Sequence, residues 1–204
     1  MANHFAKIAF TNSVKEMQSL MGSRKSYARI EAGPETNKTL TENEALFLGE
    51  RDSFYLASTS ETGWPYLQHR GGPKGFLRIL SNQEIGFADF SGNRQYISVG
   101  NFRKNPRVAL IFVDYPNQAR LKIIGEARII EAGTEDSQLS KLTPENYGAK
   151  VERGVIIHIE GYDWNCPQHI TPRWTAEEIQ KAVSPLKQKI GELEEELKKV
   201  KGEN

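Results

Sequence analysis

The sequence predicts a mainly β protein with helical appendages, in which about six antiparallel strands close into a small barrel. Between residues 52 and 160, apolar runs of strand length alternate with short stretches of turn residues. The regular alternation of strands and helices that a doubly wound α/β fold requires is not seen in this region. Runs of helical periodicity flank the strands at both ends, so an antiparallel sheet with peripheral helices is expected.

The first 50 residues are predicted to form a helical segment that packs on the barrel. In residues 10–23 the apolar side chains share one helical face. Residues 24–39 are polar and contain a Gly-Pro pair, which favours a loop. A second short helix is expected at residues 41–49, where Thr41 and Glu44 have the spacing of a capping box.

Residues 51–174 are predicted to hold the barrel. The runs with strand character are SFYLASTS (53–60), WPYLQHR (64–70), GFLRIL (75–80), EIGFADF (84–90), RVALIFVD (107–114), RLKIIGEARIIE (120–131) and RGVIIHIE (153–160). About six strands are expected from these seven runs, closed into a six-stranded antiparallel barrel. A helix is expected at residues 93–106, ending before its proline, and a helical turn at residues 139–142.

Residues 175–204 are predicted to form a C-terminal helix with a heptad-like seam. Thr175 and Glu178 have capping-box spacing, and Pro185 is expected to restart or kink the helix. Apolar residues then recur at the alternating spacing of four and three that is typical of coiled coils, at Ile179, Val183, Leu186, Ile190, Leu193, Leu197 and Val200. Two readings stay open: the helix packs on its own domain, or it joins a second subunit in a coiled coil.

The composition excludes several classes of partner. The 27 basic and 26 acidic residues give a net charge of +1, so neither nucleic acid nor a membrane surface is expected as a partner. Cys166 is the one cysteine, which rules out an intramolecular disulfide and fits a cytoplasmic protein. The N-terminus lacks the features of a secretory signal, and no apolar run is long enough to span a bilayer.

Polar residues that could bind a ligand concentrate in three clusters. In QHRGGPK (68–74), adjacent glycines let a ligand approach the backbone and Arg70 offers positive charge, although Gly-Gly-Pro is also a common turn. In DFSGNRQ (89–95), a strand ends and a helix begins beside an arginine, which suits a phosphate, although the same residues also make an ordinary turn with an N-cap.

The third cluster is NCPQHITPR (165–173), where two prolines stiffen a loop that is dense in hydrogen-bonding side chains. Cys166 and His169 belong to it, but no second Cys/His pair at ligand spacing accompanies them. A metal site is therefore not expected, and no catalytic residue is assigned.

These strands and clusters together resemble the pyridoxamine 5'-phosphate oxidase-like family of FMN-binding split barrels. The resemblance runs from about residue 41 to residue 160, and NPRVALIFVD matches the strand that follows the family's FMN-phosphate helix. The closest likeness is to a flavin-binding subgroup with the signatures HRGGPxGFL, GFADFxGNRQYxSVGN and DWNCPQHITPR. With that subgroup the resemblance covers most of the chain except the last helix.

The resemblance implies a set of FMN-binding residues. They are His69, Arg70, Gly71, Gly72, Lys74, Asp89, Phe90, Asn93, Arg94, Gln95, Ser98, Gln168, His169 and Arg173. The family's Ser-Arg-Lys phosphate run is changed here: Arg94 keeps the arginine and Gln95 replaces the lysine, so Ser98 and Lys74 are expected to compensate. The bare backbone of Gly71 and Gly72 is expected to face the flat flavin ring.

The resemblance further implies an FMN-dependent oxidoreductase acting on an unidentified small molecule or electron donor, and a homodimer with FMN at the interface. The substrate motif of the oxidase is not visible in residues 165–173, so a vitamin B6 substrate is not implied. FMN is expected rather than FAD because no Gly-x-Gly-x-x-Gly run opens a helix for a pyrophosphate. The alternatives are a non-catalytic flavin carrier or sensor, a split barrel using F420 or haem, and an interaction protein without a cofactor.

Overall fold

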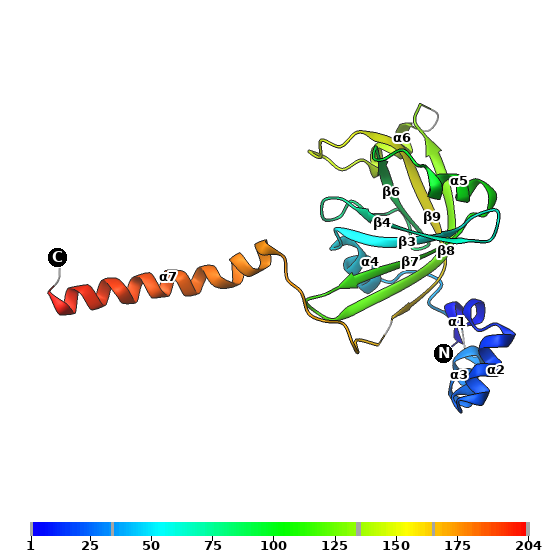
Figure 1. The fold of residues 1–204 in the computed structure, drawn as a ribbon, viewed down its shortest axis with the longest axis horizontal. Coiled ribbons are helices and arrows are strands. Elements are labelled where there is room, and N and C mark those ends of the chain that lie inside the picture. The colour runs from blue at the N-terminus through cyan, green and yellow to red at the C-terminus, as the bar shows by residue number, and fades with distance from the viewer. Residues whose placement is uncertain (1, 34, 134–135, 165, 203–204) are drawn as a thin grey trace. The chain divides into compact units, whose positions relative to one another are not determined.

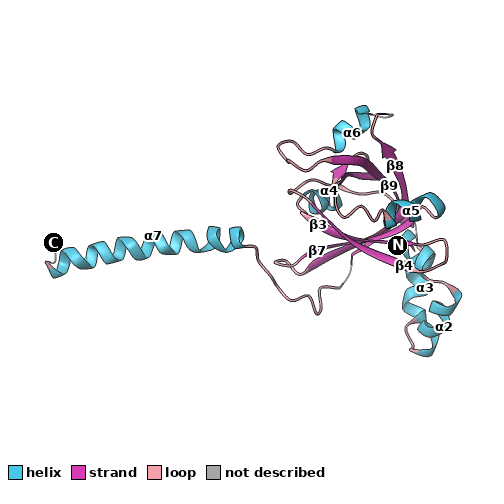
Figure 2. Cartoon of the chain, turned by 45° about the horizontal axis from the view of Figure 1, so that its top comes forward, coloured by secondary structure: helices cyan, strands magenta, loops and turns pink. Residues whose placement is uncertain are grey.

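The computed structural model describes residues 2–33, 35–133, 136–164 and 166–202 (Figure 1). The described chain divides into two units, one formed by Met1–Asp114 with Ala119–Pro167 and the other by Tyr115–Gln118 with Gln168–Asn204. The strands gather in the first unit, and helices lie at its periphery (Figure 2). No described helix is both long and apolar enough to cross a membrane.

The first unit is built on one antiparallel sheet with the strand order β4-β3-β7-β8-β9-β6-β5. Its strands are β3 (Ser53–Thr59), β4 (Pro65–Gly71), β5 (Arg78–Ile79), β6 (Glu84–Phe90), β7 (Arg107–Asp114), β8 (Ala119–Glu131) and β9 (Val151–Trp164). This confirms the predicted split barrel with helical appendages. The sheet has seven strands in the described chain rather than six, because the two-residue β5 pairs with the edge of β6.

Two long strands, β8 with 13 residues and β9 with 14, join the two halves of the sheet. The pairing between them shifts in register between Ile124 and Gly125. A Cβ atom on Gly125 would lie 2.2 Å from the carbonyl oxygen of His158, so only glycine fits this bulge. A β-bulge bends its strand and increases the local twist, which helps the sheet to curl into a barrel.

The barrel core consists of side chains that alternate along the strands. On β3, Phe54 is 1% exposed while the neighbouring Tyr55 points outward and is 40% exposed. The ring of Phe54 contacts those of Phe76, Phe87 and Phe112, with centroid separations of 5.7, 5.3 and 5.0 Å. Aromatic pairs at these distances stabilise a core beyond the area that they bury, so Phe54 links strands from both halves of the barrel.

Helices and one short strand pair surround the sheet. They are β1 (Ala2–Asn3), α1 (His4–Ala9), α2 (Asn12–Leu20), α3 (Arg24–Ala32), β2 (Glu35–Thr36), α4 (Glu42–Gly49), α5 (Ile97–Lys104) and α6 (Asp136–Leu142). The short strands β1 and β2 pair in parallel. α2, α4 and α5 lie within the predicted helical segments, and α6 includes the predicted helical turn.

The prediction of a loop at residues 24–39 is wrong, because α3 occupies most of that segment. The helix is held by side chains of other elements rather than by an apolar face of its own. Lys15 of α2 pairs with Glu31 at 2.8 Å, and the ring of Tyr27 packs edge-on against Phe10 with a centroid separation of 5.2 Å. The polar composition of the segment concealed these contacts.

The predicted capping box at the start of α4 is present, and it also connects α4 to the barrel. Glu44 accepts a hydrogen bond from the backbone N–H of Thr41 at 3.0 Å and another from the indole of Trp164 in β9 at 2.7 Å. Burial alone would raise the pKa of the Glu44 carboxyl, but hydrogen bonds from Thr41, Trp164 and Tyr162 outweigh burial and lower it. The charged carboxylate therefore links α4 to the sheet through its hydrogen bonds.

The second unit contains the helix α7 (Ala176–Lys201). Its predicted capping box is present: the hydroxyl of Thr175 accepts from the N–H of Glu178 at 3.2 Å, and the Glu178 carboxylate accepts from the N–H of Thr175 at 2.7 Å. The helix does not restart at Pro185, which lies inside one continuous element. No residue of α7 is buried in the described chain.

Candidate functional site

A cavity of about 280 Å³ opens in the first unit between β4, β6, the start of α5 and β9. β4 contributes Tyr66 and residues 68–71, and β6 contributes residues 87–90. The connection into α5 contributes residues 92–99, and β9 contributes Glu152 and Arg153. The cavity therefore lies where three strands from both halves of the barrel approach one helix N-terminus.

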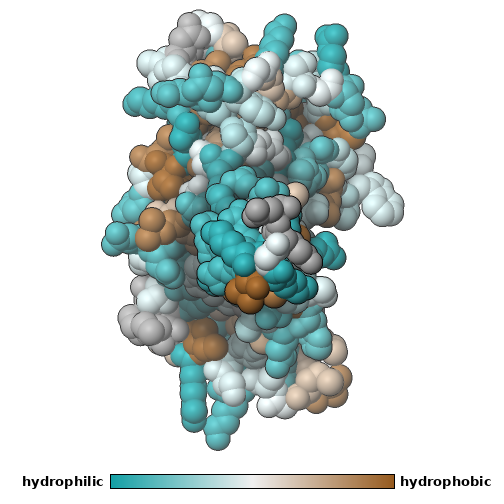
Figure 3. Space-filling model, turned by 90° about the vertical axis from the view of Figure 1, so that its left-hand side faces the viewer, coloured by the Kyte–Doolittle hydropathy of each residue, from teal (hydrophilic) through white to brown (hydrophobic). Residues whose placement is uncertain are grey.

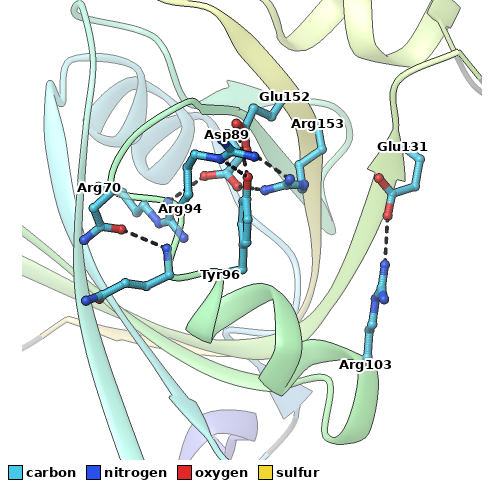
Figure 4. Close-up of polar contacts among 10 residues, drawn as sticks. Arg70, Asp89, Arg94, Tyr96, Arg103, Glu131, Glu152 and Arg153 are labelled. Carbon is cyan, nitrogen blue, oxygen red and sulfur yellow. Dashed lines mark hydrogen bonds and ion pairs between the residues drawn. The ribbon is translucent and has the colours of Figure 1, made fainter.

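A buried carboxylate, that of Asp89, ties two arginines into this cavity (Figure 4). One oxygen of Asp89 accepts a hydrogen bond from Arg70 of β4 at 2.6 Å, and the other accepts from Arg153 of β9 at 2.9 Å. Asp89 and Arg153 are directly opposite each other in the β6–β9 ladder. Burial would lower the pKa of Arg153, but the hydrogen bond and charge of Asp89 outweigh it and raise that pKa, so the guanidinium stays charged.

A second polar chain runs from Arg94 through Tyr96 to Glu152 (Figure 4). Arg94 donates through Nε to the Tyr96 hydroxyl at 3.2 Å, and that hydroxyl donates to Glu152 at 3.4 Å. The hydrogen bond to Tyr96, and the charge of Glu152, raise the pKa of Arg94. Arg153 closes the chain, because it donates to Glu152 at 3.0 Å and lies over the Tyr96 ring at 4.9 Å.

The connection before α5 holds a strained backbone. Arg94 and Tyr96 have φ angles of 60° and 54°, which lie in the left-handed region that residues other than glycine rarely adopt. Asn93 stabilises the turn, since its side-chain oxygen accepts from the N–H of Gln95 at 3.2 Å. Such strain is found at binding sites, where the surrounding structure holds it in place.

Two polar atoms in the cavity wall are buried without a hydrogen-bond partner among the described residues. One is the hydroxyl of Ser98, a residue in the first turn of α5 that is 3% exposed; the other is Nε of Arg70. Buried polar atoms in native proteins are almost always paired. Two orphaned donors in the wall of one cavity, one of them at the positive end of α5, fit a bound anion.

The structure brings most of the predicted binding residues together. Those that line the cavity are His69, Arg70, Gly71, Asp89, Phe90, Asn93, Arg94, Gln95 and Ser98. The side chain of His69 also packs on the outer side of the sheet, where its ring meets Tyr55 with a centroid separation of 5.4 Å. The first two polar clusters of the sequence therefore form one site.

Gly72 and Lys74 do not line the cavity. A Cβ atom on Gly72 would lie 2.7 Å from Cγ of Phe76, so the packing of the Phe76 ring is what requires glycine there. The exposed ammonium of Lys74 pairs with Glu50 at 3.0 Å. The glycine at position 72 was expected to let a ligand approach the backbone, but the packing of Phe76 accounts for it instead. Lys74 does not supply charge to the cavity.

The third cluster belongs to the second unit, apart from its first three residues. Arg173 lies over the ring of Tyr115 at 5.0 Å, and Gln118 donates to the carbonyl of Ile170 at 2.7 Å, so these loops hold each other. Gln168 and His169 are exposed. Asn165 lies outside the described residues.

Several lining residues were not predicted from the sequence. They are Tyr66, Phe76, Phe87, Tyr96, Glu152 and Arg153, with a few apolar or small neighbours. Arg153 is the most consequential, since it shares Asp89 with Arg70. The signal that could have found it is strand register, because a predicted pairing of β6 with β9 would have placed Arg153 beside Asp89.

The charges of the lining favour an anionic ligand. Three arginines, at positions 70, 94 and 153, face two carboxylates, those of Asp89 and Glu152, so these five side chains carry a net charge of +1. Arginine binds phosphate with directed, charge-assisted hydrogen bonds. Among the described residues, no group of three or more His, Cys, Asp or Glu side chains could hold a metal ion.

Comparisons with known proteins agree with this fold. The family model described as pyridoxamine 5'-phosphate oxidase matches residues 40–171. HupZ of Group A Streptococcus is 17% identical over 66% of this chain and 100% of its own, with a TM-score of 0.50. An FMN-binding protein of Syntrophomonas wolfei is 13% identical over 72% of this chain and 97% of its own, with a TM-score of 0.44. No curated protein matches. Because the family model covers well over half of the sequence, the chain belongs to the pyridoxamine 5'-phosphate oxidase family.

Proposed function

We propose that this protein binds FMN in the cavity between β4, β6, α5 and β9, and that it is an FMN-dependent oxidoreductase acting on a small molecule. The observation that carries the proposal is the pair of orphaned donors, Ser98 Oγ and Arg70 Nε, in the wall of one arginine-rich cavity. A phosphate would supply acceptors for both. Membership of the family makes FMN the natural source of that phosphate.

In this proposal the start of α5 holds the phosphate. Ser98 would donate its hydroxyl, the first N–H groups of the helix would point at the anion, and Arg94 would add a charged donor. Arg70 and Arg153 keep fixed orientations because Asp89 holds both. Gly71 and the backbone of β4 would offer a flat edge to the ring system.

When bound, FMN supplies the redox chemistry, passing electrons between a donor and a small-molecule acceptor. The described residues would bind it, orient it and limit the access of water. The one compact anion site at α5 favours FMN, which carries a single phosphate group, over FAD, whose pyrophosphate needs more donors.

We further propose that FMN lies at the interface of a homodimer. The cavity of one chain measures about 280 Å³, at the lower end of the range of about 300–1,000 Å³ that is usual for pockets of small ligands. In this proposal a second subunit would cover the parts of the ligand that extend out of the cavity. On the outer face of β3 and β4, Tyr55 and Leu67 are 40% and 62% exposed, which offers apolar surface to a second subunit.

Gln168, His169 and Arg173 remain candidates for contact with the partner's flavin, since their polar side chains are exposed in the described chain. Figure 3 shows one face of the molecule, on which hydrophobic areas are scattered among hydrophilic ones.

The first experiment is to identify the cofactor of the purified protein by its absorption spectrum and by mass spectrometry of the released ligand. FMN in the protein supports the proposal, and turnover with a reduced nicotinamide or with oxygen would establish the enzyme. Bound FMN without turnover in a broad screen of donors would indicate a carrier or sensor. A colourless protein that takes up no FMN would refute the proposed function. The absorption spectrum of a deazaflavin or of haem would show that the protein binds that cofactor instead of FMN.

The second experiment measures oligomeric state by sedimentation across a dilution series, with FMN occupancy followed in the same samples. The proposal requires that FMN dissociates as the dimer does. A monomer that keeps its FMN at the lowest concentration would overturn the shared site.

A further inference from the structure

Helix α7 carries an apolar seam along its whole length that nothing in the described chain covers. The residues of the seam are Ile179, Val183, Leu186, Ile190, Leu193, Leu197 and Val200, and all but the partly buried Val183 are at least 50% exposed. They recur at alternating spacings of four and three, which keeps them on one face of a helix. An exposed apolar stripe of this regularity marks an interaction surface.

Helix α7 is poorly suited to stand alone. Pro185 removes one hydrogen bond of the helical ladder, and Gly191 weakens the next turn because it favours the unfolded backbone. Both residues lie off the seam, Pro185 directly before Leu186 and Gly191 directly after Ile190. A helix with these interruptions and no buried face needs a partner along its seam to be stable.

The composition of the seam specifies the partner. Taking Val183, Ile190 and Leu197 as heptad positions a, the other seam residues occupy positions d. In the two heptads from Val183 to Leu193, β-branched residues at a with leucine at d favour two parallel strands over larger assemblies, while the last heptad has leucine at a and valine at d. The charges beside the seam agree, because positions g and e hold opposite charges in the C-terminal heptads.

In a parallel pair, each g position faces the e position of the next heptad in the other helix. Lys189 would then face Glu194 of the partner subunit, and Glu196 would face Lys201 of the partner subunit. Lys189 now pairs with Glu192 of its own helix at 3.3 Å, but its side chain is 62% exposed and free to turn. The helix is thus complementary to a second copy of itself.

From this self-complementarity we propose that α7 pairs with α7 of a second copy of the chain in a parallel, in-register, two-stranded coiled coil. The pairing is independent of the cofactor. It would hold two barrels at a high effective concentration, so that a site shared between them forms even when the protein is dilute.

The test uses the full chain with Cys166→Ser, so that one introduced thiol is the only thiol present. Leu193→Cys places it at a seam position, and Glu195→Cys places it two residues away on the outer face. Mild oxidation of two thiols to one disulfide can then join only two copies of the chain. In a parallel in-register pair, Leu193→Cys should cross-link about ten-fold faster or more than Glu195→Cys, because its two thiols are held together. Equal rates would overturn the proposal.

A second pair of variants needs no cross-link. Leu193→Lys puts a charge in the seam, whereas Glu195→Lys puts the same residue on the outer face. We expect Leu193→Lys to lose helical circular dichroism and self-association at concentrations where Glu195→Lys keeps both, while the barrel stays folded in each. If both variants keep the helix and the assembly of the unmodified protein, α7 does not pair through this seam. If the seam instead binds its own barrel or another protein, the Leu193→Cys cross-link will not form.

Discussion

Replacement of Ser98 by alanine should stabilise the ligand-free protein and weaken FMN binding at the same time. Ser98 is 3% exposed, and its hydroxyl has no hydrogen-bond partner among the residues that the structure describes. An unpaired buried hydroxyl costs about 1–3 kcal/mol, which alanine avoids. For a chain of this size, each kcal/mol corresponds to a rise in Tm of about 2–4 °C.

The loss of affinity follows from the same atom. A hydrogen bond to a charged group contributes about 1.5–3 kcal/mol. Without the hydroxyl as donor to the phosphate, the Kd for FMN should therefore rise roughly 10- to 150-fold. Thermal unfolding of the ligand-free protein and titration with FMN, followed by flavin fluorescence, measure the two effects separately.

Ser58→Ala is the matched control. Ser58 is as buried as Ser98, at 3% exposed, but its hydroxyl accepts a hydrogen bond from Asn101 at 2.9 Å, away from the cavity. Alanine would leave the buried Asn101 amide unpaired and should destabilise the protein by about 1–3 kcal/mol without changing the affinity for FMN. If Ser98→Ala behaves in the same way, its hydroxyl is structural and the phosphate is not bound at α5.

Three further substitutions probe the arginines and the packing around the cavity. Arg94→Ala should weaken FMN binding more than the control Arg103→Ala does. Arg103 lies in the same segment but pairs with Glu131 at 3.3 Å outside the cavity (Figure 4). Equal affinities of the two variants for FMN in a fluorescence titration would show that Arg94 is not part of the site. Asp89→Asn leaves two arginines without their shared anion, so denaturant unfolding should show a loss of about 3–5 kcal/mol, and a loss below about 1 kcal/mol would contradict the bridge. Burial, together with the nearby Glu44 carboxylate, raises the pKa of Tyr162 to about 12 in the folded protein. The stability that this raised pKa contributes is complete below pH 10 and is lost as the pH rises towards 12. Tyr162→Phe has no group that titrates there, so it should lose less stability than the unmodified protein between pH 10 and pH 12. Equal losses in the two proteins would show that the pKa of Tyr162 is not raised in this way.

The barrel could be predicted from the sequence because its signals are local. Alternating burial along strands such as β3 and β7, and capping residues such as Thr41 with Glu44, are visible within a few residues of sequence. Helix α3 was missed because its evidence is not local: Glu31 is held by Lys15 of another helix. Pattern alone cannot show a helix whose face is completed by distant side chains.

The candidate site divides in the same way. Arg70, Asp89 and Arg94 stand in motifs that a reader of the sequence can find, and the cavity unites them. Arg153 stands near the start of β9, beside Glu152 and before the apolar run of that strand, and its role appears only when β6 and β9 are in register. Gly72 shows the converse, since it stands in the same motif as Arg70 but packs against Phe76 and does not line the cavity.

The site concentrates energetic costs that a fold without a ligand would have no reason to keep. Left-handed backbone costs about 1–3 kcal/mol for each residue other than glycine. Of six such residues in the described chain, Arg94 and Tyr96 lie in this one wall, two positions apart, and the other four lie outside it. Buried donors without partners also occur elsewhere in the described chain, at Nε of Arg78 and Arg120, so an orphaned atom alone would mean little. In the cavity, two such donors coincide with that strain and with an excess of positive charge. A bound anion would relieve two of these costs together, because it would accept hydrogen bonds from the unpaired donors and balance the charge of the arginines. Before the anion binds, Asp89 holds Arg70 and Arg153 in place by its two hydrogen bonds.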